Sequence, residues 1–155
     1  MKRRIQSAER TESSEEFQPD RFRSTRLAHQ TETAEDYVEL IEELLKTRGE
    51  ARVIDLAERF GVALPTVTKI VTRLHREGLV DTRAYRSIQL TQCGSALAER
   101  VKRRHAIVVD FLRCIGIDEE TARIDAEGME HHVSDQTLAV FERIIRERGS
   151  PASQE

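Results

Sequence analysis

The sequence contains only two cysteines and no long apolar run, and each shortage excludes a class of protein. No uninterrupted apolar run, such as residues 106–109, exceeds four residues, against the roughly 18 that a membrane-spanning helix requires. After the basic residues 1–4, polar residues stand where a signal peptide would have its apolar stretch. We therefore expect no membrane partner, no export signal and a cytoplasmic location.

The cysteine spacing and the charge balance exclude further classes. Cys93 and Cys114 are 21 positions apart, which fits neither a disulfide scaffold nor the C-x-x-C spacing of a thiolate zinc site, so we expect both thiols to be reduced. With 25 basic and 28 acidic residues, the net charge of −3 does not indicate a nucleic-acid partner. Such a role must show as a local excess of positive charge.

The chain divides into three parts by composition. Residues 1–33 are rich in Arg, Glu, Ser, Thr and Gln, and we expect them to form a mobile N-terminal extension. The alternative for this segment is a helix that docks onto a partner or a phosphate backbone through Arg21, Arg23 and Arg26. Residues 34–91 and 92–155 are expected to form a DNA-binding domain and a helical domain.

Apolar spacing predicts a mainly α-helical chain. Apolar stripes at residues 37–45, 53–60 and 67–74 end at glycines and predict three helices, with Pro65 in the first turn of the third. Alternation from Leu79 to Thr91 predicts a small β-hairpin. A long helix follows from Gln92 to Gly116, and Asp118 and either Ser134 or Asp135 can cap two more.

This order of elements is that of a winged helix-turn-helix, in which the third helix enters the DNA major groove. Between Val62 and Leu90 there are five basic and two acidic residues, so this stretch is locally +3. A solvated helical surface is the alternative explanation. We predict DNA contacts from the third helix and from the hairpin tip, namely Pro65, Thr66, Thr68, Lys69 and Arg73, and Arg83, Tyr85 and Arg86.

Clustered acidic residues indicate a metal site. Helical geometry places Glu127, Glu130 and His131 on one face, where the two carboxylates repel each other unless a cation lies between them. The alternative is an exposed acidic helix. Asp36 and Glu39, three positions apart on the first predicted helix, form a second carboxylate pair, and a histidine stands in the long helix at position 105. A helix cap from Thr33 to Asp36 and a core histidine are the corresponding alternatives.

Together these motifs resemble a known family. A first helix with E-D-Y-x-E, a helix-turn-helix with P-T-V-T-K, a long helix with R-R-H and the segment E-G-M-E-H-H-V-S are similar to the manganese transport regulator (MntR) branch of the diphtheria-toxin-repressor (DtxR) family. The resemblance covers about residues 34–149, and residues 1–33 lie outside it. It implies a winged helix-turn-helix DNA-binding domain followed by a helical domain for metal binding and dimerisation.

The resemblance also implies the ligands and the metal. Carried over onto this sequence, the family's ligands are Asp36, Glu39, His105, Glu127, Glu130 and His131. Iron-responsive relatives have Met and Cys where this chain has Asp36 and Glu127, and oxygen donors suit Mn²⁺ better than sulfur donors do. In the family such a cluster holds two manganese ions per subunit, and their +4 would neutralise the four carboxylates. Fe²⁺ is the alternative metal.

The implied function is that of a transcriptional repressor. The resemblance predicts a metal-activated homodimer that binds a palindromic double-stranded operator and controls manganese uptake genes, without a small organic ligand. The expected dimer surface lies on the C-terminal helices, with intramolecular packing as the alternative for its apolar residues: Val108, Phe111, Leu112, Leu138, Phe141 and Ile145.

Three other functions compete with this interpretation. They are an iron-responsive repressor of the same family, a winged-helix regulator that senses an organic ligand, and a hydrolase with a binuclear metal centre. The sequence lacks a separate nucleophile and a phosphate-binding glycine loop, so we expect no enzyme activity.

Overall fold

The computed structural model describes residues 19–82 and 87–148, which are mostly helical. This confirms the predicted class, a winged helix-turn-helix followed by a helical unit. The helices and strands are α1 (Pro19–Arg48), α2 (Val53–Phe60), α3 (Leu64–Arg76), β1 (Val80–Asp81), β2 (Gln89–Leu90), α4 (Gln92–Cys114), α5 (Glu119–Met129) and α6 (Asp135–Arg148).

Local sequence signals explain where these elements begin and end. Gly61 ends α2 with a φ of 63°, a left-handed conformation that glycine adopts without steric cost, and Pro65 lies in the first turn of α3. Asp118 caps α5 by accepting a hydrogen bond from the Thr121 amide, as the sequence predicts. Ser134 caps α6 in the same way through the amide of Thr137.

The hairpin is short, and it closes the DNA-reading unit. Strands β1 and β2 are antiparallel, with Val80 opposite Leu90 and Asp81 opposite Gln89. Helices α1, α2 and α3 and this hairpin share one apolar core, in which Ile41, Leu56 and Leu74 are fully buried. The predicted tip residues Arg83, Tyr85 and Arg86 lie outside the described residues.

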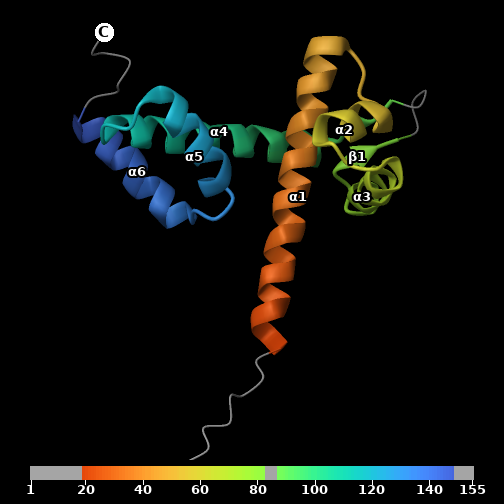
Figure 1. Cartoon of the computed structure of the whole chain (residues 1–155), viewed down its shortest axis with the longest axis horizontal. Coiled ribbons are helices and arrows are strands. Elements are labelled where there is room, and N and C mark those ends of the chain that lie inside the picture. Colours follow the sequence, from red (N-terminus) through yellow and green to blue (C-terminus); the bar gives the residue numbers. More distant parts are fainter. Residues whose placement is uncertain (1–18, 83–86, 149–155) are drawn as a thin grey trace, which may run out of the picture.

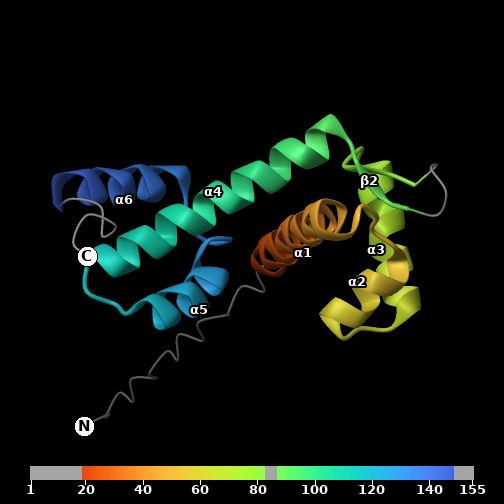
Figure 2. The same ribbon diagram turned by 90° about the horizontal axis from the view of Figure 1, so that it is seen from above.

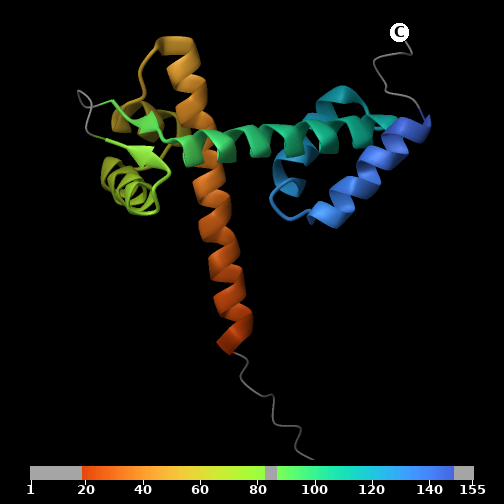
Figure 3. The ribbon, with the colours of Figure 1, turned by 180° about the vertical axis from the view of Figure 1, so that it is seen from behind.

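Helix α1 crosses α4 and separates the two halves of the fold (Figure 1). The helix-turn-helix and the hairpin lie on one side of α1, and α5 and α6 lie on the other (Figure 3). Seen from above, α4 runs from the hairpin to α5 and α6 (Figure 2). The two halves therefore meet where α1 and α4 pack against each other.

No helix in the described part of the chain is long and apolar enough to cross a bilayer.

A second apolar core joins α4, α5 and α6. Val108, Leu112 and Leu138, three residues that the sequence assigned to a dimer surface, are buried within one chain. Phe111 and Phe141 stack on each other, with ring centroids 3.8 Å apart and an interplanar angle of 2°. Intramolecular packing, the alternative left open above, therefore accounts for much of this apolar stripe.

Helix α1 begins earlier than the sequence indicated. Its first residue is Pro19, so residues 19–33 are helical and continuous with the first predicted helix, and residues 1–18 lie outside the described residues. Side chains 26–31 are all exposed. A helical segment without a packed face has no apolar stripe, which explains why periodicity did not detect it.

Candidate metal centre

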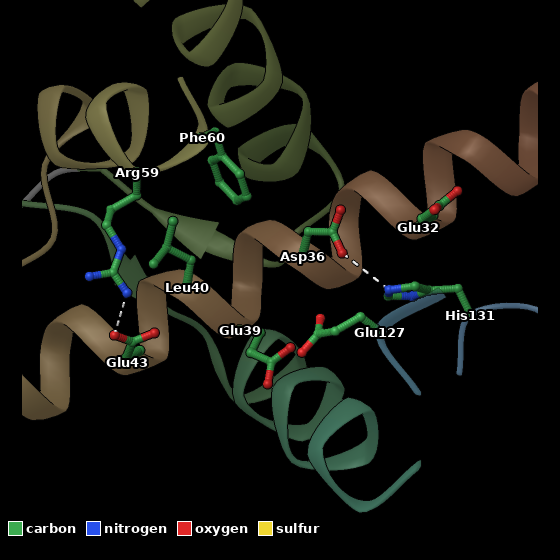
Figure 4. A pocket seen from close by; sticks show the side chains of 9 residues that line it. All are labelled: Glu32, Asp36, Glu39, Leu40, Glu43, Arg59, Phe60, Glu127 and His131. Carbon is green, nitrogen blue, oxygen red and sulfur yellow. Dashed lines mark hydrogen bonds and ion pairs between the residues drawn. The ribbon is translucent and has the colours of Figure 1, made fainter. Parts of the chain in front are cut away.

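The six predicted ligands come from both halves of the fold. Asp36 and Glu39 lie on α1, His105 lies in the middle of α4, and the other three lie at the C-terminal end of α5 and in the turn after it. Asp36, Glu39, Glu127 and His131 line an open cavity of about 510 Å³, and the carboxylates of Glu39 and Glu127 face each other across it (Figure 4).

His105, Glu127 and Glu130 form the tightest part of this cluster. Each offers a ligand atom that lies within 4.8 Å of the other two. The Nδ1 of His105 is 2.6 Å from Oε2 of Glu130 and 3.8 Å from Oε1 of Glu127. Glu130 is 2% exposed, so its carboxylate is held against the imidazole away from bulk water. Two carboxylates and one imidazole at these distances are a suitable donor set for a divalent cation.

His131 provides a second meeting point, between the two halves. Its Nε2 is 3.2 Å from Oδ1 of Asp36 on α1 and 3.7 Å from Oε1 of Glu130. Glu130 thus contacts both histidines, one with each carboxylate oxygen. The structure therefore brings all six predicted residues to one region where α1, α4 and the end of α5 meet.

The predicted placement of Glu130 and His131 on one continuous helix was wrong. Helix α5 ends at Met129, Glu130 is its C-cap, and His131 lies in the turn that follows. The position that a continuous helix would give His131 therefore does not apply. Its ring reaches Asp36 because the turn folds back against α1, and contacts between distant segments hold it there.

The electrostatics of the site favour bound protons when no cation is present. Burial raises the pKa of Asp36, Glu39 and Glu130, and the negative charge of Glu127 raises each of them further. Burial lowers the pKa of His131, but the hydrogen bond that Glu35 accepts from the imidazole and the charges of Asp36 and Glu130 outweigh it and raise this pKa. A divalent ion would compete with protons for the same groups.

Two residues of this network were not identified from the sequence. Glu35 accepts a hydrogen bond from Nδ1 of His131 at 2.8 Å, and Arg104 donates to the other oxygen of Glu35 at 3.4 Å. Both stand directly beside predicted ligands, Asp36 and His105. No local pattern in the sequence distinguishes the buried Glu35 from the many exposed glutamates of this chain. A further acidic residue, Glu32, lines the cavity.

The predicted DNA-reading residues on α3 form an exposed surface. Pro65, Thr66, Thr68 and Lys69 are exposed. Arg73 is partly covered, because its Nη2 donates to the main-chain oxygen of Gln30 on α1 at 3.1 Å. A groove of about 570 Å³ lies between the two helices, and its charged lining residues are all basic: Lys69, Arg73 and Arg76.

Two family models match the chain. The iron dependent repressor, N-terminal DNA binding domain matches residues 29–88, and the iron dependent repressor, metal binding and dimerisation domain matches residues 91–152. These two matches cover the two halves of the described fold.

Two curated relatives share more than two fifths of the aligned residues with this chain. The transcriptional regulator MntR of Escherichia coli O157:H7 is 46% identical over 136 residues, 88% of each chain. The HTH-type transcriptional regulator MntR of Bacillus subtilis (strain 168) is 41% identical over 104 residues, 67% of this chain and 73% of that one.

Solved structures of metal-dependent repressors have a similar fold. A manganese-dependent transcriptional repressor in complex with manganese is 32% identical, with a TM-score of 0.63 over 76% of this chain and 53% of that chain. The manganese regulator SloR is 28% identical, with a TM-score of 0.63 over 73% of this chain and 53% of that one. This chain therefore spans about half the length of these two solved relatives.

A DNA-reading unit joined to a helical metal-binding and dimerisation domain defines a metal-dependent transcriptional regulator. The chain belongs to the iron-dependent (diphtheria-toxin) repressor family and, within it, to the manganese transport regulator (MntR) branch. Its relatives are transcriptional regulators, which confirms the expectation that it is not an enzyme.

Proposed function

We propose that this protein is a manganese-activated repressor that binds a palindromic operator as a homodimer and controls manganese uptake genes. The observation that supports this most directly is the position of α1. The same helix carries Asp36 into the metal cluster and Ile41 into the core of the DNA-reading unit. A cation bound at the cluster therefore acts on α1, and because α1 is packed into the DNA-reading unit, the two must move together.

The donor set supports Mn²⁺ as the activating ion. The proposed ligands Asp36, Glu39, His105, Glu127, Glu130 and His131 provide four carboxylates and two imidazoles and no sulfur, which suits Mn²⁺ or Fe²⁺. When bound, the metal supplies positive charge and a fixed coordination geometry to these groups. We propose two ions, one near His105 and one near His131, because Glu130 directs one oxygen to each histidine.

The proposed mechanism is a coupling between metal binding and DNA binding. Without metal, the carboxylates from α1 and α5 repel each other, and the hydrogen bonds to His131 and Arg104 fix the two halves less firmly than a bound cation would. With metal, the same groups hold the halves together, and less ordering remains to be done on DNA. Linkage requires that operator DNA tighten Mn²⁺ binding by the same factor, typically about 1–3 kcal/mol.

We further propose where the functional segments lie. The DNA-binding domain spans residues 34–91. Its third helix contacts base edges or phosphates through Pro65, Thr66, Thr68, Lys69 and Arg73, and the hairpin residues Arg83, Tyr85 and Arg86 follow the DNA backbone. The helical domain spans residues 92–155 and provides the dimer surface. A regulator of this kind acts on chromosomal DNA in the cytoplasm, without an organic ligand.

Fluorescence anisotropy with DNA from upstream of manganese uptake genes tests the proposal. We expect binding with Mn²⁺ and its loss with chelator, and parallel titrations with Fe²⁺ and Zn²⁺ rank the metals at one stated salt concentration. The double variant Glu127→Ala, Glu130→Ala should lose Mn²⁺-dependent binding while it keeps its helical circular dichroism. Asp125→Ala, an exposed acidic residue of the same helix, is the matched control. Equal operator binding with Mn²⁺ and with chelator would overturn the proposal.

A further inference from the structure

Glu35 is a buried charged residue at the junction of three segments. It lies on α1 and is 3% exposed. One carboxylate oxygen faces Nδ1 of His131 at 2.8 Å, and the other faces Nη1 of Arg104 on α4 at 3.4 Å. A buried carboxylate is costly unless it is paired and hydrogen-bonded, and Glu35 has a partner on each oxygen.

Arg104 connects this carboxylate to the turn that carries His131. Its Nη2 donates to the main-chain oxygens of Glu130 and of Val133, the latter at 3.2 Å. The last carbonyls of a helix have no partner within the helix, and a nearby arginine can satisfy them. Arg104 thus ties the end of α5 to α4, while Glu35 ties the same arginine to α1.

The hydrogen bond that His131 donates to Glu35 determines which nitrogen of the imidazole is free to bind a metal. A carboxylate accepts, so the imidazole nitrogen that faces it, Nδ1, carries the hydrogen. The lone pair of the neutral ring is then on Nε2. That nitrogen is 3.2 Å from Oδ1 of Asp36 and 3.7 Å from Oε1 of Glu130, on the side where the proposed ligands converge.

We propose that Glu35 is a positioning residue for the metal site, which holds His131 in the tautomer and orientation that present Nε2 to the cation. Arg104 supports Glu35 and fixes the turn that carries the ring. Carboxylates that orient metal-binding histidines in this way commonly change metal affinity by about 10- to 100-fold when they are removed. This inference rests on the proposed metal site and assigns it a residue that binds no metal itself.

Nitrogen-15 NMR of the imidazoles in the metal-free protein provides a direct test. At alkaline pH, where imidazoles are neutral, the two ring nitrogens have different shifts that identify the tautomer. In the wild type we expect the hydrogen of His131 on Nδ1. In Glu35→Ala we expect a mixture of tautomers, and in Glu35→Gln, which keeps one acceptor oxygen, an intermediate proportion. A residue that only stabilised the fold would not change this ratio.

Calorimetric titration with Mn²⁺ provides the second measurement. Glu35→Ala should weaken binding by about 10- to 100-fold and Glu35→Gln by a smaller factor. The matched control is Glu42→Gln, which also replaces an α1 carboxylate paired with a cation of α4, Lys102, but lies outside the metal cluster. We expect the control to bind Mn²⁺ as the wild type does.

The outcomes distinguish a failure of the positioning role of Glu35 from a failure of the proposed metal site. An unchanged tautomer and unchanged Mn²⁺ affinity in Glu35→Ala would overturn the positioning role. If Glu35→Ala does not fold, the same two results in Glu35→Gln would overturn it. Wild-type protein that binds no Mn²⁺ would instead refute the proposed metal site. The tautomer of metal-free His131 would still report whether Glu35 orients the ring.

Discussion

Replacement of Glu130 by glutamine separates the metal-binding role of this residue from its structural role. The side chain is 2% exposed, and its two oxygens lie 2.6 Å from His105 Nδ1 and 3.7 Å from His131 Nε2. Glutamine has the same shape and keeps one oxygen as an acceptor. It removes the negative charge that a cation needs, and its NH₂ group can donate but cannot bind a metal.

The expected effect of Glu130→Gln on the free energy of unfolding differs sharply between the metal-free and the metal-bound protein. Without metal, the variant loses a charged hydrogen bond, which costs about 1.5–3 kcal/mol. It also no longer buries a negative charge close to other carboxylates, and this gain offsets part of the loss. We therefore expect the free energy of unfolding to change by about 1 kcal/mol. At a free Mn²⁺ concentration 100 times its dissociation constant, the wild type gains about 2.7 kcal/mol, which raises its Tm by roughly 5–10 °C. The Glu130→Gln variant should gain almost none of this.

Thermal unfolding followed by circular dichroism, with Mn²⁺ and with chelator, measures both quantities. Asp125→Ala serves again as the control and should show the full rise in Tm with Mn²⁺. An equal rise in the Glu130→Gln variant would show that the Glu130 carboxylate does not bind the metal. A collapse of the metal-free variant would show that the carboxylate has an indispensable structural role, and either result would refute the reasoning.

Three further predictions concern pH, DNA and packing. Because Asp36, Glu39, Glu130 and His131 have raised pKa values, the metal-free folded state binds more protons at these four groups than the unfolded state does. Its free energy of unfolding should therefore fall as pH rises from about 4 to above 6.5, and saturating Mn²⁺ should abolish this trend in urea titrations. Lys69→Ala should reduce the salt dependence of operator binding by about one unit of slope if this side chain binds a phosphate, whereas an unchanged slope would place it away from the backbone. Gly94→Ala should destabilise the fold by about 1–3 kcal/mol, because the new Cβ would lie 2.0 Å from the main-chain oxygen of Leu79, while Gly128→Ala meets no atom within 4 Å and should stabilise α5 by up to about 1 kcal/mol.

Much of the fold could be predicted because its signals are local. Glycines at the ends of apolar stripes, Pro65 at the start of α3 and Asp118 before α5 specify their helix boundaries through backbone conformation and hydrogen bonds to near neighbours. The order of the elements then identified the winged helix-turn-helix. These features depend on residues a few positions apart, which a sequence displays directly.

The parts that could not be predicted depend on contacts between distant segments. Glu35 and His131 are 96 positions apart, and only the crossing of α1 with the other half of the fold makes them partners. The end of α5 at Met129 is fixed in part by Arg104, which lies on another helix. The early start of α1 was missed for a different reason, because its exposed first turns give no apolar periodicity.

The neighbouring residues Asp36 and Tyr37 point to opposite functional parts of the molecule. Asp36 faces His131, while the ring of Tyr37 stacks on Phe60, the last residue of α2, with centroids 4.5 Å apart and an interplanar angle of 17°. One peptide bond joins the two, so we expect a displacement of Asp36 on metal binding to shift the ring of Tyr37 against Phe60. The substitution Phe60→Leu should then reduce the factor by which Mn²⁺ increases the affinity for operator DNA, although it changes none of the proposed metal ligands.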